Sequence, residues 1–132
     1  MPIEYRIDHG LGIVNHEFTG EISFADLAQH WRRFLSDPEL PDPLVMLADL
    51  RRCRMLIHGE DASRLVHAVI QPLLKGRRWV SAVVADSNAE YGVTKQFTVY
   101  SSHCGETEVF REESEAVAWL LGAAAPRAKA AD

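Results

Sequence analysis

The chain has 132 residues, of which 47% are hydrophobic and 25% are charged, and its formal net charge is −5. These values are typical of one folded domain and exclude extended disorder. The acidic balance argues against general nucleic-acid binding, because contacts to phosphates need a basic surface.

The N-terminal segment predicts a β-hairpin. Residues Ile3 to Ile7 alternate between apolar and polar side chains, as a half-buried strand does. Asp8-His9-Gly10 provides turn residues, and Leu11 to Phe18 continues as a second strand. We expect Thr19-Gly20-Glu21 to end that strand.

A helix is expected to follow, beginning at Ser23. Ser23 and Asp26 have the spacing of a capping box, and Asp37-Pro38 ends the helical pattern. The residues between them predict one buried and one exposed face. The apolar face comprises Phe24, Leu27, Ala28, Trp31, Phe34 and Leu35, and the polar face comprises Gln29, His30, Arg32 and Arg33.

Two continuous apolar runs predict the centre of a sheet. Leu44–Ala48 and Trp79–Ala85 have the pattern of strands that are covered on both faces, as in a parallel sheet. We expect the two strands to be neighbours that point the same way. Asp49 and Asp86, which follow them, would then lie at one edge of the sheet.

Two helices are predicted between and after these strands. Arg51 to Gly59 is interpreted as a loop, and a helix runs from about Glu60 to Lys75. Pro72 should kink or end this helix, because proline removes a helical hydrogen bond. Asp86-Ser87-Asn88 caps another helix, from about Ala89 to Ser102.

The C-terminal part completes the predicted fold. Glu108–Phe110 is a short strand, Glu112–Leu121 the last helix, and Gly122 its stop. The order is ββαβαβαβα, an α/β fold with a mixed, mostly parallel sheet of about five strands and four helices. We expect one domain over residues 1–122 and a flexible tail over residues 123–132.

The N-terminus and the cysteines indicate a cytoplasmic protein. The first residues, MPIEYRID, resemble no signal peptide, and no segment is apolar enough to span a membrane. Cys53 and Cys104 lie far apart, which favours reduced thiols.

A candidate binding site lies at the carboxyl edge of the predicted parallel strands. Arg51 or Arg52 could hold an anion there, together with backbone N–H groups at the start of the second helix. The simpler interpretation, which we favour, is that the carboxylates cap backbone groups and the arginines keep a loop soluble. The candidate ligand- or partner-binding residues are Asp49, Arg51, Arg52, Arg54, His58, Asp86 and Tyr91.

The sequence predicts no metal site, no cofactor and no catalytic centre. Structural zinc generally needs four convergent ligands, and the histidines show no HxH or HExxH spacing. A site from His58, His67 and a cysteine stays open. His103-Cys104 lacks a third orienting group, and neither GxSxG nor a Walker motif occurs. The six histidines are His9, His16, His30, His58, His67 and His103.

Three stretches resemble the SpoIIAA-like (STAS-like) family of small bacterial proteins: LVMLADL, VSAVVADSNAEYG and VFREESEAVAWLLG. The resemblance covers Ile3 to Gly122. It implies a sheet with packed helices, related to anti-sigma-factor antagonists and, distantly, to CRAL-TRIO lipid-exchange domains. Such antagonists carry a phosphorylatable serine in a pattern like DLSGVxFxDSSG. In the equivalent stretch here, DLRRCRMLIHGE, His58 and Gly59 occupy the positions of the paired serines. The resemblance therefore does not imply a phosphorylation switch in this chain.

Three functions are therefore considered. The favoured one is a non-catalytic binding or regulatory module that binds a protein partner through Arg51 to Gly59 and the second helix; a homodimer is a further option. The alternative is a carrier or sensor of a lipid-like or other apolar small molecule. Trp31, Phe97 or Tyr100 would line its pocket, although such aromatic residues more often fill a core. The second alternative is a small enzyme that uses Asp49 and Asp86.

Overall fold

Five strands form one sheet in the order β1-β2-β3-β4-β5. The computed structural model describes residues 2–131, with side chains described for residues 2–123. β1 (Ile3–Asp8) is antiparallel to β2 (Ile13–Ile22), and β2, β3 (Leu44–Met55), β4 (Trp79–Val84) and β5 (Gly105–Phe110) are parallel. The mixed, mostly parallel sheet is confirmed, as is the side-by-side placement of the two apolar strands β3 and β4.

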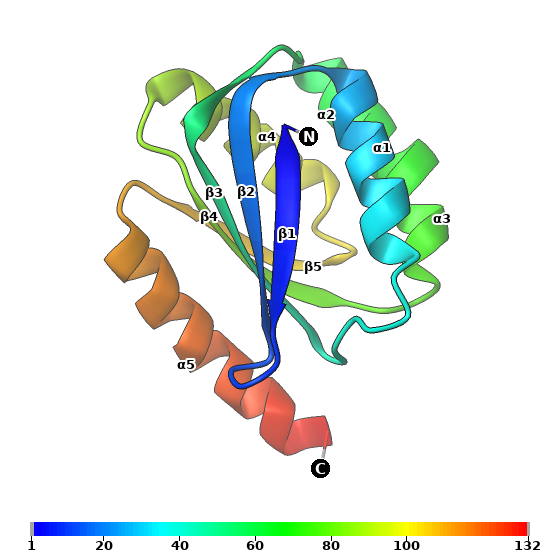
Figure 1. Ribbon diagram of the computed structural model, residues 1–132, viewed down its shortest axis with the longest axis vertical. Coiled ribbons are helices and arrows are strands. Elements are labelled where there is room, and N and C mark those ends of the chain that lie inside the picture. The colour runs from blue at the N-terminus through cyan, green and yellow to red at the C-terminus, as the bar shows by residue number, and fades with distance from the viewer. Residues whose placement is uncertain (1, 132) are drawn as a thin grey trace.

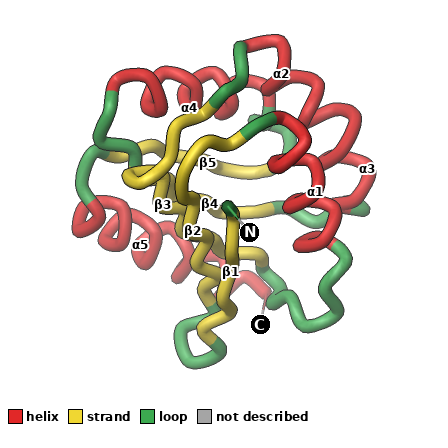
Figure 2. Tube along the Cα trace, turned by 45° about the horizontal axis from the view of Figure 1, so that its top comes forward, coloured by secondary structure: helices red, strands yellow, loops and turns green. Residues whose placement is uncertain are grey.

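Helices cover both faces of the sheet (Figures 1 and 2). One face carries α1 (Phe24–Leu35), α2 (Gly59–Arg64), α3 (Gln71–Leu74) and α4 (Asn88–Tyr100). A π-helical segment, η1 (Leu65–Ile70), joins α2 to α3 without a break, so these three form one of the four expected helices. The opposite face carries α5 (Glu113–Ala131). The predicted element order is confirmed.

Two cores result from the alternation of side chains along the strands. The larger core lies under α1 to α4 and includes Trp31, Phe34 and Trp79. The smaller core lies under α5, and it consists of Ile13, Val45, Val80, Ala82, Val84, Ala116 and Leu120. Successive residues along β3, and likewise along β4, thus pack into different cores.

Strands β2, β3 and β5 are longer than the sequence predicts, and β5 begins at Gly105 rather than at Glu108. β2 continues through Thr19-Gly20-Glu21, because Gly20 adopts a left-handed φ of 74° and the pairing with β3 shifts after Glu17. A β-bulge of this kind absorbs an irregular residue without ending the strand. β3 continues to Met55, so the predicted loop is wrong for Arg51 to Met55, whose polar side chains hid the extension.

Pro72 does not end the second helix. The N–H of Gln71 donates to the carbonyl of Val66, five residues earlier, which is the wider spacing of a π-turn. Proline has no N–H of its own and its ring crowds the preceding turn, so the wider turn accommodates it. The helix ends at Leu74, where Lys75 takes a left-handed conformation with φ 55°.

The expected stop at Gly122 is also wrong, because α5 continues through it to Ala131. Glycine lowers helix stability by about 1 kcal/mol but is compatible with helical dihedrals. The expected flexibility of residues 123–132 stays a prediction, since the side chains of residues 124–132 lie outside the described residues. Among residues 2–131, no helix has the length and apolar character needed to cross a bilayer.

Candidate functional site

An apolar cavity of about 80 Å³ lies between the sheet and helices α1, α2 and α4. Its size is intermediate between the roughly 10–15 Å³ that one water needs and the roughly 150 Å³ of an engineered cavity that binds benzene. A molecule of a few non-hydrogen atoms therefore fits. The sheet contributes His16, Ala48, Ser81 and Val83, and the helices contribute Leu27, Trp31, Ala62, Leu65 and Phe97.

Large rings beside small residues explain why this space stays open. Trp79 stacks on Trp31 of α1 and on Phe97 of α4, with ring centroids 5.8 and 6.2 Å apart. Beside this stack, the floor of the cavity is formed by short side chains such as Ala48 and Ser81. Of the three aromatic residues that the sequence singled out, Trp31 and Phe97 line the cavity, whereas Tyr100 only packs against the core.

Two buried histidines contact each other, and one of them lines the cavity. His16 of β2 lines it, and His16 Nδ1 lies 3.1 Å from Nε2 of His30 on α1. The expected placement of His30 on the polar face of α1 is wrong, because His30 is only 2% exposed. His16 alternates with Val14 and Phe18 along the strand, which places it on the inward face. Because histidine is also frequent at surfaces, the sequence did not predict the contact between His16 and His30.

The histidine pair is uncharged at neutral pH. Burial lowers the pKa of His16 well below its ordinary value, and the nearby His30 lowers it further. Burial and the Arg33 guanidinium lower the pKa of His30 to about 4. Burial and a 2.6 Å hydrogen bond to Asp37 raise the pKa of the neighbouring Tyr5 to about 12.

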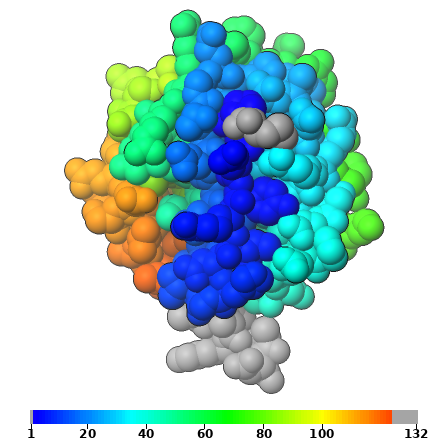
Figure 3. Space-filling view, in the orientation of Figure 1, coloured from blue at the N-terminus to red at the C-terminus, as the bar shows by residue number. Residues whose placement is uncertain are grey.

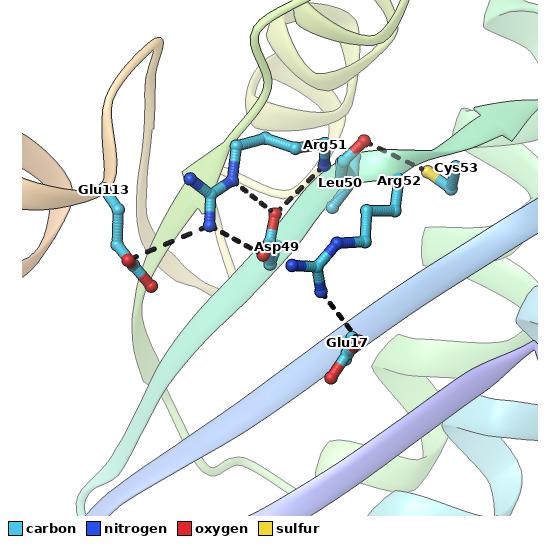
Figure 4. A network of polar contacts seen from close by, with 7 residues as sticks. All are labelled: Glu17, Asp49, Leu50, Arg51, Arg52, Cys53 and Glu113. Atoms are coloured by element: carbon cyan, nitrogen blue, oxygen red, sulfur yellow. Dashed lines mark hydrogen bonds and ion pairs between the residues drawn. The ribbon is translucent and has the colours of Figure 1, made fainter.

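The sequence-predicted residues Asp49, Arg51 and Arg52 lie together (Figure 4). None of the three lines the apolar cavity. Arg51 donates from Nε and Nη2 to the two oxygens of Asp49, both at 2.9 Å, and its Nη2 lies 3.8 Å from Glu113. Arg52 Nη1 lies 3.2 Å from Glu17. The hydrogen bond from Arg51 holds the pKa of Asp49 below its usual value. Arg51 is thus already paired with carboxylates.

The carboxylates Glu17, Asp49 and Glu113 line a polar depression of about 370 Å³ on the side of the sheet that carries α5. In the space-filling view, the blue surface of β1 and β2 lies open between α1 and α5 (Figure 3). The register places Glu4 opposite Glu17, and Glu17 opposite Asp49, across three neighbouring strands. The lining also includes Arg6, Asn15, Leu47 and Glu113.

The other predicted site residues do not converge with Asp49. Asp86 and Arg54 are exposed, and the backbone carbonyl of Asp86 accepts a hydrogen bond from Arg111. The same guanidinium lies 4.2 Å from the ring centroid of Tyr91. His58 is the exposed N-cap of α2, and its backbone N–H donates to the Asp61 carboxylate. The role of the predicted set in ligand or partner binding stays a prediction.

The thiols and the remaining histidines are dispersed. Burial raises the pKa of Cys53 to about 12, and burial also raises that of Cys104. His67 and His103 stack with ring centroids 5.7 Å apart. Within the described part of the chain, no three His, Cys, Asp or Glu side chains are grouped as metal ligands would be.

The fold is similar to that of a known structure. An uncharacterised protein of the DUF3478 family from Shewanella loihica PV-4, described as having a SpoIIAA-like fold, aligns with 89% of this chain and 91% of its own. The TM-score is 0.56 and the sequence identity is 17%. This likeness confirms the SpoIIAA-like fold. Comparisons with protein-family models and with curated proteins give no match.

Proposed function

We propose that the chain is a non-catalytic binding module that carries or senses a small apolar molecule in the cavity under α1, α2 and α4. The cavity is the observation that supports this function. Protein interiors leave few voids larger than a water molecule. An empty volume of about 80 Å³ costs about 2 kcal/mol at roughly 24 cal/mol per Å³. A ligand that fills the space offsets this cost.

The wall formed by α2 and η1 suits the entry of a ligand. Ala62 and Leu65 line the cavity from a helix that changes from α to π hydrogen bonding between them. Such π-turns are frequently found at functional sites. Leu56 is 47% exposed and lies in sequence between two lining residues, Met55 and Ile57. This segment therefore connects the cavity lining to the surface.

A pair of matched substitutions tests the proposal, with isobutane as the probe. Ala48→Leu adds about three carbons to the cavity, whereas Ala82→Leu adds them to the packed core under α5. We expect saturable isobutane-induced NMR shifts at the lining residues of the wild type and at least tenfold weaker binding by Ala48→Leu. Filling the cavity gains up to about 2 kcal/mol of stability, whereas overpacking at Ala82 costs about 1–3 kcal/mol. Wild-type protein that shows no saturable shift would contradict the proposal.

Binding of a protein partner is a second candidate function. The polar depression favours it, because this side of β1 and β2 presents ionisable side chains of both signs. Mixed charges at an interface steer association and select partners rather than provide most of the affinity. Asp49 and Glu17, which line this surface, are paired with Arg51 and Arg52.

A charge-removal experiment tests this second candidate. We expect Arg51→Ala, Arg52→Ala and Arg54→Ala, combined in one variant, to lose the partners that wild-type protein captures in a pull-down. Lys75→Ala with Arg78→Ala, at the opposite end of the parallel strands, is the matched control. Partners retained by the triple variant would show that this surface is the wrong one.

A further inference from the structure

Strand β1 forms one edge of the sheet, and only β2 pairs with it. In an antiparallel pair, residues that bond to the neighbouring strand alternate with residues whose N–H and C=O groups point away from it. The N–H of Thr19 donates to the carbonyl of Pro2 at 2.8 Å, so residue 2 and every second residue after it bond toward β2. The residues between them direct their backbone groups outward, and these are Ile3, Tyr5 and Ile7.

Helix α1 covers only one end of this outer edge. Arg33 Nη2 donates to the outward carbonyl of Ile3 at 3.2 Å, and its guanidinium lies 5.6 Å from the ring centroid of Tyr5. Among the described residues, no group bonds to the outward N–H and C=O of Tyr5 and Ile7. β1 also lies uncovered at the front of the molecule (Figures 1 and 3). An open strand edge of this kind is a template for pairing with another strand.

The exposed side chains of β1 carry opposite charges that have no partner of their own. Glu4 and Arg6 both line the polar depression, and neither forms an ion pair within the described part of the chain. Glu4 instead lies opposite Glu17 of β2, and like charges directly opposite each other destabilise a sheet. A cation on the outer side of Glu4 would relieve this repulsion.

We infer that a second copy of this chain pairs with the open edge, β1 against β1 in antiparallel orientation, about a twofold axis at Tyr5. Tyr5 then lies opposite Tyr5 of the partner subunit, and the two exchange both of their backbone hydrogen bonds. Ile3 lies opposite Ile7 of the partner subunit. The carbonyl of Ile3 can accept from Arg33 and from that residue together, because a carbonyl oxygen has two lone pairs. Such a self-complementary twofold contact is the commonest form of homo-oligomer.

The charges of β1 select this register. With the axis at Tyr5, Glu4 lies opposite Arg6 of the partner subunit, in the type of pair whose Cα atoms are only about 4.5 Å apart. The same contact is repeated across the axis. A slip of two residues in one direction would place Glu4 opposite the partner's Glu4, and a slip in the other direction would place Arg6 opposite the partner's Arg6. Only the register centred on Tyr5 pairs opposite charges.

A charge-swap experiment tests this interface. We expect wild-type protein to dimerise with a Kd below about 1 mM in sedimentation equilibrium. Glu4→Arg and Arg6→Glu each create two like-charge contacts and should weaken the dimer about tenfold. The double variant Glu4→Arg, Arg6→Glu restores both pairs and should return the Kd to within about threefold of wild type. Glu108→Arg, an exposed charge reversal on the opposite edge strand β5, is the control and should leave the Kd unchanged.

Wild-type protein alone also gives a decisive measurement. In a mixture of differently isotope-labelled copies, NMR should show an intersubunit NOE between the α protons of Glu4 and Arg6, which face each other in this register. A chain that stays monomeric at about 1 mM would overturn the inference. A dimer without this NOE, single variants that dimerise as wild type does, or a double variant as weak as the single ones would also overturn it. The apolar cavity lies on the other face of the sheet, so these outcomes leave the proposed function unchanged.

Discussion

The two faces of the sheet are built from the same strands but are packed differently. Under α5, small residues such as Ala82 and Ala116 are completely buried and the core is continuous. Under α1, α2 and α4, the rings of Trp31, Trp79 and Phe97 meet beside a cavity whose lining includes the buried His16. Incomplete packing and unpaired polar atoms thus occur together on one face, and this coincidence favours that face as the place of function.

Truncation of one leucine on each face should give the largest difference in unfolding free energy between the two faces. Leu120 of α5 is completely buried in the smaller core, whereas Leu27 of α1 faces the cavity. We expect Leu120→Ala to cost about 4 kcal/mol of unfolding free energy and Leu27→Ala about 2 kcal/mol. The reason is that a side chain beside a void loses fewer contacts when it is removed.

Urea denaturation of both variants measures this difference. Leu27→Ala also enlarges the cavity, so it should bind benzene, and benzene should raise the stability of this variant alone. Equal costs for the two truncations, with no effect of benzene, would mean that both faces are packed to the same density.

The fold was largely predictable because it depends on local patterns. The capping box of Ser23 and Asp26, with both of its hydrogen bonds, forms as the sequence indicates. The apolar strands β3 and β4 pair in parallel, as their composition requires. The errors fall where a local signal is overridden. Pairing with β2 extends β3 past its apolar part, and a π-turn carries the helix across Pro72.

The candidate site was much less predictable. The sequence directed attention to Asp49 and Asp86, because carboxylates at strand ends mark ligand sites in many sheets of this type. Asp49 instead pairs with Arg51 on the face that carries α5. The site proposed here depends on a void between the sheet and the helices, and no periodic pattern reveals a void. One polar residue placed inward among Val14 and Phe18 was the available signal.

Stability at acidic pH offers a further test of the difference between the faces, since the core under α5 contains only apolar residues within the described chain. His30 has a pKa of about 4 in the folded protein and about 6.5 when unfolded, so below about pH 6.5 the unfolded state binds a proton that the native state excludes. The contribution of His30 to stability is therefore present above pH 6.5 and declines toward pH 4, by about 3 kcal/mol.

The stabilising contributions of Asp37 and Asp49, whose pKa values are lowered, also decline in acid, but they do so in every variant. We therefore expect wild-type protein to lose at least about 3 kcal/mol more than the double variant His16→Phe, His30→Phe between about pH 7 and pH 4, because the lowered pKa of His16 adds to the effect of His30. Tyr5 and Arg33, which face the pair, are unchanged in that variant, so parallel pH profiles would show that the histidines are not buried in neutral form.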